Sequence, residues 1–364
     1  MKIKLSTEAL KLATSKASKG AGNLSMLTIT SALTLESVEG NLILTTTTNS
    51  HNLEVKIKDV TSKDNKFFAC TDCELFTKLV SKTDTENIIL EVTENALMFT
   101  GNGVYNLPLI QDEEGTMARI TPIEVDALEE VTVSSMELKK LLTWNKLAVA
   151  KTLEEPIFTG YCVKDNKIFT YNNITVCVSR LKLDKVNMLI PSGIVNLFSL
   201  FEDKNVTVKT TNNKVSFATD DVVITGALLE GFDLYPTEQL SALVDGEDFK
   251  NKVKISKNKF SNMLDRLGLF VQEDKNEIVM SFGKDKLVVS DKGSSVGEQI
   301  SYIGTTESPN FECKIDLNDI KGIIGEISGE EVCLLYGSDV GICVYNDNMN
   351  YIIPLLTDSE DEEE

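Results

Sequence analysis

A single pattern occurs six times along this 364-residue chain, and it restricts the possible folds more than any other feature. Each copy has an apolar strand end, a residue that caps a helix, a helix, and then three short alternating segments. The caps begin at positions 6, 71, 134, 191, 256 and 316, which are 65, 63, 57, 65 and 60 residues apart. Such a regular period indicates one supersecondary unit that is repeated six times.

The copy between residues 187 and 236 shows the pattern most clearly. Pro191 and Ser192 supply a helix start, because a proline in the first turn has no needed N–H to lose. Apolar residues follow with helical spacing, and the polar links Asn212-Asn213 and Asp220-Asp221 then favour hairpins between three strands. Each unit is therefore predicted to be a strand, a helix and three strands, which gives an α+β fold.

Pairing the six units predicts three similar domains of about 120 residues, each large enough for its own core. The boundaries fall at 1–111, 130–236 and 252–357. The strongest helix is expected over 134–151, and polar connectors are expected to begin at Gln111 and to span 237–251. Residues 358–364 carry acidic side chains and no core residue, which predicts a disordered acidic tail.

Composition and motifs narrow the function class. No apolar run is long enough for a membrane helix and no secretory signal is present, so a cytoplasmic protein is expected. The seven cysteines are expected to be reduced, and the spacing of Cys70 and Cys73 lacks a second ligand pair for zinc. The chain has one histidine and no phosphate loop, metalloprotease motif or nucleophile elbow. We therefore expect a protein that is not an enzyme and binds no metal or cofactor.

The charge distribution gives the first indication of a partner. The net charge is −20, yet the helices predicted at 7–20, 134–151 and 256–271 hold ten basic and three acidic residues. Lysines on a single helix usually serve solubility. Because lysine-rich helices recur at equivalent places in all three predicted domains, a basic surface that binds phosphates without reading the bases is favoured. We therefore predict sequence-independent contact with duplex DNA through Lys11, Lys16, Lys19, Lys139, Lys140, Lys146, Lys151, Lys257, Lys259 and Arg266.

Several strings, in order and spacing, resemble the bacterial-type DNA polymerase sliding clamp, the beta subunit of DNA polymerase III. The resemblance extends from the start of the chain to about Leu356. Its most specific pieces are Leu189-Ile190-Pro191, Leu228-Leu229-Glu230-Gly231-Phe232, Phe158-Thr159-Gly160, Val176-Cys177 and Tyr351-Ile352-Ile353-Pro354-Leu355.

This resemblance implies a ring-shaped homodimer of three-domain chains. Such a ring encircles duplex DNA, acts as a processivity factor in DNA replication by tethering the replicative DNA polymerase, and is opened by a clamp loader. Helix packing gives an independent reason for two chains. Six helices in a circle leave a bore of roughly 10 Å and twelve leave nearly 30 Å, whereas a B-form duplex needs about 20 Å.

The resemblance also implies two protein interfaces. The dimer contact would join the strand 104–110, including Leu107, to the helix end at Leu269 and Phe270, although these last two are equally compatible with an internal core. A pocket for partner peptides would be formed by residues that are mostly apolar, which are also compatible with a plain core. These are Phe158, Thr170, Ile174, Asn318, Val340, Ile353, Pro354 and Leu355.

Two alternatives remain at this point. One is an acidic, repeat-built scaffold for protein interactions that does not bind DNA. The other is the three-chain type of clamp, which has four units per chain rather than six.

Overall fold

A computed structural model describes residues 1–22, 28–58, 60–62, 66–127, 130–152, 154–183, 186–245, 249–271, 276–291, 296–305 and 310–357. The chain forms two compact units. Unit 1 contains Met1–Leu138 and Pro191–Leu228, and unit 2 contains Lys139–Ile190 and Leu229–Glu364. The predicted acidic tail, 358–364, lies outside the described residues.

The larger sheet of unit 1 combines strands from distant parts of the sequence. Within the described residues its order is β10-β15-β16-β17-β4-β3-β2-β6. β17 pairs antiparallel with β4 in a register that places Ile224 opposite Leu53, so two repeats share one continuous sheet. The strands are β2 (Ala32–Val38), β3 (Asn41–Thr47), β4 (His51–Ile57), β6 (Phe68–Asp72), β10 (Glu130–Ser134), β15 (Asn205–Thr210), β16 (Lys214–Ala218) and β17 (Val222–Ala227).

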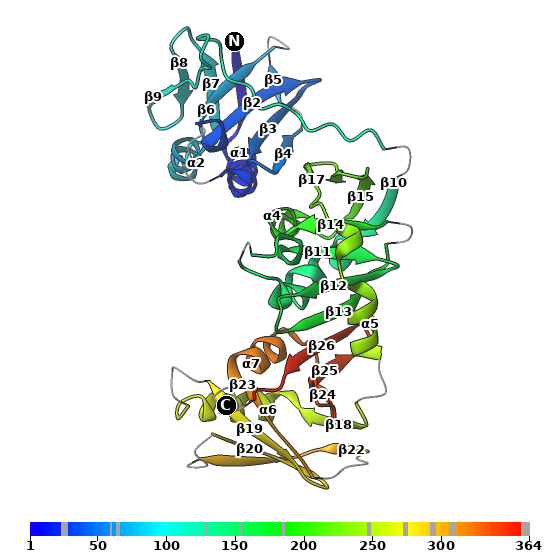
Figure 1. The fold of residues 1–364 in the computed structure, drawn as a ribbon. Helices are drawn as coiled ribbons and strands as arrows, with labels where there is room; N and C mark the ends of the chain where they lie inside the picture. Colours follow the sequence, from blue (N-terminus) through cyan, green and yellow to red (C-terminus); the bar gives the residue numbers. More distant parts are fainter. Residues whose placement is uncertain are drawn as a thin grey trace. The chain divides into compact units, whose positions relative to one another are not determined.

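The second sheet of unit 1 has the order β5-β1-β7-β8-β9 in the part of the chain that is described. Its strands are β1 (Lys2–Ser6), β5 (Thr61–Ser62), β7 (Asn87–Val92), β8 (Ala96–Thr100) and β9 (Val104–Pro108). The helices α1 (Thr7–Ala17) and α2 (Cys73–Lys82) lie side by side (Figure 1). Their buried residues recur at helical spacing, as in Leu10, Ala13, Thr14 and Ala17.

Unit 2 is built in the same way. Its larger sheet has the order β14-β11-β12-β13-β26-β25-β24-β18-β22 among the described strands, and β13 pairs antiparallel with β26 across the repeats. The strands are β11 (Gly160–Lys164), β12 (Lys167–Tyr171), β13 (Val176–Arg180), β14 (Met188–Pro191), β18 (Asn251–Ser256), β22 (Ile303–Thr305), β24 (Glu331–Tyr336), β25 (Gly341–Asn346) and β26 (Met349–Pro354).

The smaller sheet of unit 2 has the order β21-β20-β19-β23. Its strands are β19 (Glu277–Phe282), β20 (Lys286–Asp291), β21 (Gly297–Ser301) and β23 (Phe311–Asp316), and α6 (Lys257–Leu267) packs against α7 (Leu317–Glu326) (Figure 1). Phe260, Leu264, Ile320 and Ile324 of these helices are buried in one core with the sheets. The fold is thus α+β, as predicted.

Three of the predicted helix starts have a side-chain cap, whereas Pro191 and Ser256 precede their helices without a side-chain cap hydrogen bond. The side chain of Ser6 accepts a hydrogen bond from the Ala9 N–H, Asp72 accepts one from Leu75, and Asp316 accepts from Asn318 and Asp319. These side-chain acceptors satisfy N–H groups that the first helical turn leaves without intrahelical partners. Asp72 lies between Cys70 and Cys73, whose thiols are buried, so this segment is a strand end and helix cap.

The prediction of a strong helix over 134–151 is wrong. The α-helix α3 covers only Ser135–Lys139 and is followed by two short 3₁₀ turns, η3 (Lys140–Leu142) and η4 (Asn145–Ala148). Thr143 between them has φ −98° and ψ −83°, outside the helical region.

Tertiary contacts explain this break. The indole N–H of Trp144 donates to the Glu326 carbonyl at 3.2 Å. The buried Asn145 amide donates to Thr170 at 3.3 Å and accepts from Ser179 at 2.6 Å. These bonds hold the segment against the sheet, and they outweigh its helix propensity.

The prediction that residues 237–251 form a polar connector is also wrong. It contains α5 (Thr237–Asp245), whose residues Thr237, Leu240 and Val244 are buried. Pro236 before the helix and this three-and-four spacing were the sequence signals that should have indicated it. The remaining short helices of the described chain are η1 (Ser18–Gly20), η2 (Thr28–Ser31), η5 (Pro156–Thr159), α4 (Ser192–Asn196), η6 (Leu197–Leu200) and η7 (Phe232–Leu234).

The two units divide the predicted middle domain. Its first repeat lies mainly in unit 2, and its second repeat lies mainly in unit 1. This division follows from the sheets, because β15, β16 and β17 continue into β4, whereas β11, β12 and β13 continue into β26.

His51 is the single histidine of the chain and is buried at the start of β4. Its Nδ1 lies 3.0 Å from the Ser50 hydroxyl and 3.1 Å from that of Thr48. Burial lowers the pKa of His51 below its ordinary value, because the charged imidazolium is poorly solvated there. The native state therefore holds this side chain neutral.

We predict that the free energy of unfolding falls as the pH is lowered from 7 to 5. Below about pH 6.5 the unfolded chain binds a proton on His51 that the native state resists, at a cost of up to about 1.4 kcal/mol per pH unit. Chemical denaturation of the unaltered chain and of His51→Gln over this range tests it. In His51→Gln the free energy of unfolding should depend less steeply on pH. Identical pH dependence in the two proteins would contradict the conclusion that the native state resists protonation of His51. Burial raises the pKa of Glu54, so protonation of this carboxyl at low pH favours the native state and opposes the effect of His51.

Candidate nucleic-acid and partner interfaces

The lysines of α1 differ in their surroundings. Lys19 is exposed in η1, and Lys11 is half-buried without an ion pair among the described residues. The Lys16 side chain is 11% exposed and lies 2.9 Å from Glu202 and 3.3 Å from Asp221. The predicted DNA contacts of this helix are therefore not equivalent, because Lys16 already has two carboxylate partners within unit 1.

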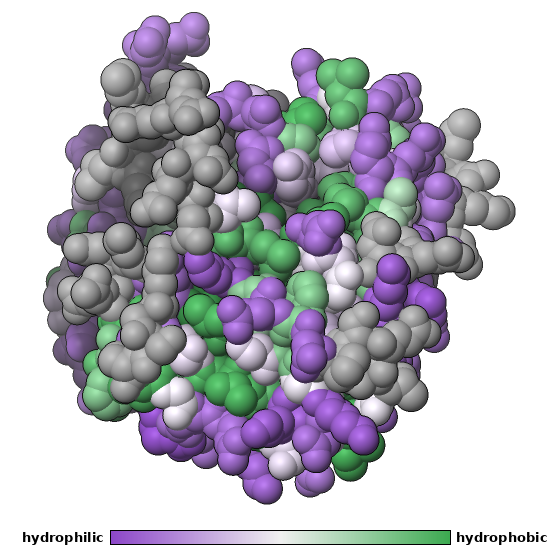
Figure 2. Space-filling view, turned by 60° about the horizontal axis from the view of Figure 1, so that its bottom comes forward, coloured by the Kyte–Doolittle hydropathy of each residue, from purple (hydrophilic) through white to green (hydrophobic). Residues whose placement is uncertain are grey.

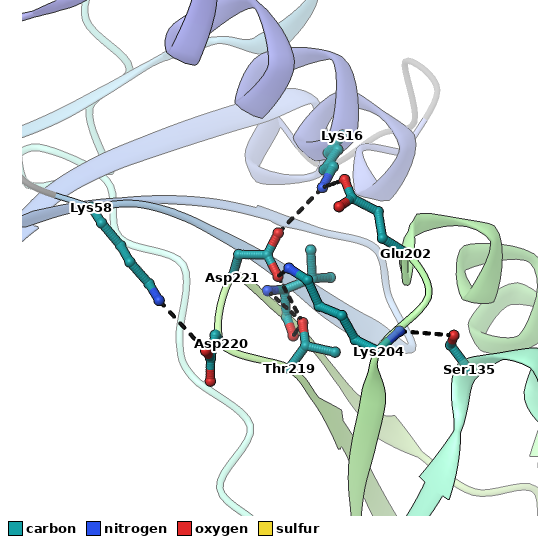
Figure 3. A network of polar contacts seen from close by, with 9 residues as sticks. Lys16, Lys58, Ser135, Glu202, Lys204, Thr219, Asp220 and Asp221 are labelled. Carbon is teal, nitrogen blue, oxygen red and sulfur yellow. Dashed lines mark hydrogen bonds and ion pairs between the residues drawn. The ribbon is translucent and has the colours of Figure 1, made fainter.

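A polar network surrounds Lys16 (Figure 3). Asp221 also accepts from Lys204 at 2.8 Å and from the Thr219 hydroxyl at 3.0 Å. Burial by itself raises the pKa of Asp221, but the hydrogen bonds from Lys204 and Thr219 and the charge of Lys16 outweigh it and lower that pKa to about 2. Asp221 is thus ionised at neutral pH and neutralised locally.

The cations predicted on 134–151 lie on short turns and a loop. Lys139 and Lys140 are half-buried, and each has an interaction with its surroundings. Lys146 of η4 and Lys151, which follows it in a loop, are exposed and form no ion pair within the described chain. These last two have side chains that are accessible to an anion.

The cations of α6 also divide into two kinds. The Lys257 ammonium donates to the carbonyls of Gly325 and Ile327 at the end of α7, where a positive charge complements the helix dipole. Arg266 forms two hydrogen bonds with Glu298 of β21, one of them at 2.8 Å. Lys259 is exposed and has no such partner among the described residues.

Four of the predicted peptide-pocket residues lie at one end of the larger sheet of unit 2. Val176 of β13 is opposite Ile352 of β26, and Gly341 of β25 is opposite Pro354. Continuing these registers past the strand ends brings four residues to the same edge: Ile174, Val340, Pro354 and Leu355. Ile174 is 62% and Val340 39% exposed, and Pro354 and Leu355 are half-buried.

The other pocket candidates are placed differently. Phe158 is buried and packs edge-to-face against Tyr171 and Tyr235, with ring centroids 5.0 and 5.4 Å apart. Thr170 and Ile353 are fully buried, and Thr170 belongs to the Asn145 hydrogen-bond group. Asn318 is exposed near the start of α7.

The aromatic neighbours of Phe158 were not predicted as site residues. Tyr171 is half-buried at the end of β12, beside the turn that carries Ile174, and Tyr235 is buried. Leu234, directly before Tyr235, is 76% exposed. The segment Phe232-Asp233-Leu234-Tyr235-Pro236 contains three large apolar side chains beside a proline, and this was the available signal.

The predicted dimer contacts include both buried and exposed side chains. Leu107 is buried opposite Leu97, but its strand β9 is at the edge of its sheet and exposes Val104 and Tyr105. Leu269 is 81% and Phe270 59% exposed after α6, so neither is core within this chain. Figure 2 shows hydrophobic side chains in patches among hydrophilic ones on one face of the molecule.

Within the described residues, no group of three or more histidine, cysteine, aspartate or glutamate side chains is arranged to hold a metal ion. No helix in the described part of the chain is both long and apolar enough to cross a membrane.

Comparison with known proteins identifies the class. No family model matches the chain. The beta sliding clamps of Staphylococcus aureus and Staphylococcus epidermidis are 21% and 20% identical to it over 312 residues, which is 80% of each chain.

Solved structures agree over almost the whole length. The sliding clamp of Bacillus subtilis has a TM-score of 0.85 at 16% identity and covers 98% of this chain and 99% of its own. The sliding clamp of Pseudomonas aeruginosa bound to griselimycin has a TM-score of 0.87 at 14% identity, with the same coverage. A putative DNA polymerase III beta subunit of Eubacterium rectale has 0.84 at 18%, with 98% and 100% covered.

The chain therefore has the sliding-clamp fold. Within that class it resembles the bacterial type, the beta subunit of DNA polymerase III, and the resemblance predicted from its sequence is confirmed.

We predict that Thr170→Val lowers the free energy of unfolding by about 1–3 kcal/mol, because it removes a buried hydroxyl that pairs with Asn145. Ile174→Val, at an exposed position of the same sheet end, should change it by less than about 0.5 kcal/mol. Urea unfolding of both variants tests this difference. Equal effects would show that the hydrogen bond between Asn145 and Thr170 adds no net stability.

Proposed function

We propose that this chain is a sliding clamp, a processivity factor that closes around duplex DNA as a homodimer and tethers the replicative DNA polymerase. The observation that carries this proposal is the match in fold, over 98% of the chain, to solved sliding clamps and DNA polymerase III beta subunits. The proposed ring would have three domains of two repeats in each chain. A clamp loader would open it, and the clamp itself would catalyse no reaction.

The charge distribution supports DNA as the central partner. Lys11, Lys19, Lys146, Lys151 and Lys259 form no ion pair among the described residues, although the whole chain has a net charge of −20. Lysine attracts phosphates as a point charge without reading bases, which suits a protein that must move along DNA of any sequence. The acidic remainder of the surface would repel nucleic acid.

Topological retention on DNA tests this function directly. One end of a linear duplex is fixed to a bead, the protein is added at low salt, and the free end is then blocked with streptavidin. A clamp should stay on the doubly blocked DNA after a 1 M salt wash and leave after restriction cleavage, because salt removes electrostatic adhesion but not a closed ring. An acidic scaffold would show no retention, and loss at high salt despite blocked ends would contradict encirclement.

We predict that the triple variant Lys19→Glu, Lys146→Glu and Lys259→Glu weakens binding to duplex DNA at low salt. It should also lower the slope of log affinity against log salt by about one per lost phosphate contact. The matched control is Lys4→Glu, Lys209→Glu and Lys286→Glu, which makes the same charge change on exposed strand positions. Fluorescence anisotropy with a labelled duplex measures both quantities. Equal losses in the two triples would indicate a general charge effect instead of a binding surface.

The apolar end of the larger sheet of unit 2 supports peptide docking. Ile174 and Val340 are exposed beside half-buried Pro354 and Leu355. The aromatic group of Phe158, Tyr171 and Tyr235 adjoins the turn that carries Ile174. A short peptide with apolar and aromatic anchors could bury its side chains on such a surface.

We predict that Ile174→Asp reduces binding of an apolar peptide from a polymerase C-terminus at least tenfold, since a carboxylate would be desolvated on docking. The control is Leu269→Asp, which makes the same change at an exposed apolar position that follows α6. It should leave peptide affinity unchanged. Isothermal calorimetry with the peptide measures the difference, and full affinity in the Ile174 variant would disprove this docking site.

A further inference from the structure

The network around Lys16 joins segments that are far apart in the sequence. It connects α1 to the turn at 202–204 and to the turn at 219–221 between β16 and β17 (Figure 3). The backbone of Lys204 forms two hydrogen bonds with Ser135. Its carbonyl accepts from the Ser135 N–H at 2.9 Å, and its N–H donates to the Ser135 hydroxyl at 3.3 Å. All of these residues belong to unit 1.

Charges within this group are balanced. Lys16 and Lys204 share Asp221, and Glu202 is a second carboxylate for Lys16. Asp221 is 25% exposed, so its ion pairs are shielded from solvent more than ordinary surface pairs are. Removing one partner from a shielded group is costly, because the remaining charge stays poorly solvated.

The end of α1 is also fixed from its other side. The hydroxyl of Thr46 donates to the Ala17 carbonyl at 2.7 Å. Gly20, which ends η1, lies so close to Leu53 that a Cβ atom would come within 2.5 Å of that side chain. Lys19, the exposed cation, therefore lies between two anchored points, Lys16 and Gly20.

We propose that Lys16 is a positioning residue that makes no contact with DNA phosphates. Its two carboxylate partners hold the last turn of α1 against the turns at 202–204 and 219–221. This attachment fixes the direction in which Lys19 is presented. The proposal rests on the proposed clamp function, and it separates two lysines of one helix that the sequence pattern treats as equivalent.

The ion pairs give a physical reason to assign different roles to Lys16 and Lys19. An ammonium group has three donors, and two of those of Lys16 are directed at carboxylates at hydrogen-bond distance. Although burial by itself lowers the pKa of Lys16, its hydrogen bonds to Glu202 and Asp221 and their charges raise that pKa overall. A phosphate would have to displace a carboxylate that is already bound.

The test compares Lys16→Met, Lys16→Arg and Lys19→Met by duplex-DNA anisotropy at several salt concentrations and by thermal unfolding. Lys16→Met keeps the aliphatic stem and removes the charge. We expect it to lower the unfolding midpoint and to weaken DNA binding about three- to tenfold with an unchanged salt slope. Lys19→Met should leave the midpoint unchanged and lower the salt slope by about one. Lys16→Arg should restore both stability and affinity.

Two results would overturn the proposal. A salt slope lowered by about one in Lys16→Met would show that Lys16 itself contacts phosphate. An unchanged midpoint together with unchanged affinity in that variant would show that the network positions nothing. Failure of the clamp function would appear differently, as an unaltered chain that is not retained on doubly blocked DNA after the salt wash, while the midpoint of Lys16→Met would still report on the network.

Discussion

Backbone pairing between distant repeats is the interaction on which the structure depends. β17 pairs with β4 in unit 1 and β13 pairs with β26 in unit 2, so each large sheet is shared by two repeats. A single strand-helix-strand unit could not bury its apolar face alone, and sharing a sheet lets two units cover one core. These two pairings therefore join repeats that are not adjacent in sequence.

Electrostatic pairing decides which cations remain available on this framework. Lys16, Lys257 and Arg266 are engaged by partners within their own units, whereas Lys19, Lys146 and Lys259 are exposed. A count of lysines per helix cannot separate these groups, because their partners, such as Glu202 and Glu298, come from other elements. The available positive charge is therefore smaller than the sequence pattern indicates.

Local signals in the sequence predict much of this fold. Capping residues such as Asp72 and Asp316 locate helix starts, and alternating segments locate strands, because these features depend on neighbouring residues. The break at Thr143 could not be predicted, since it depends on hydrogen bonds from Trp144 and Asn145 to distant strands and helices. The burial of the pocket candidates could not be predicted either. Ile174 and Thr170 are four residues apart, yet Ile174 is exposed and Thr170 is fully buried.

The placement of two rare side chains makes the two units separately observable. Trp144 is the chain's single tryptophan and is hydrogen-bonded in unit 2, whereas the single histidine, His51, lies in unit 1. Tryptophan fluorescence consequently reports the loosening of one unit, and the imidazole proton resonances report the other. Whether the two units unfold together or one after the other is therefore measurable in the natural protein, without attached dyes.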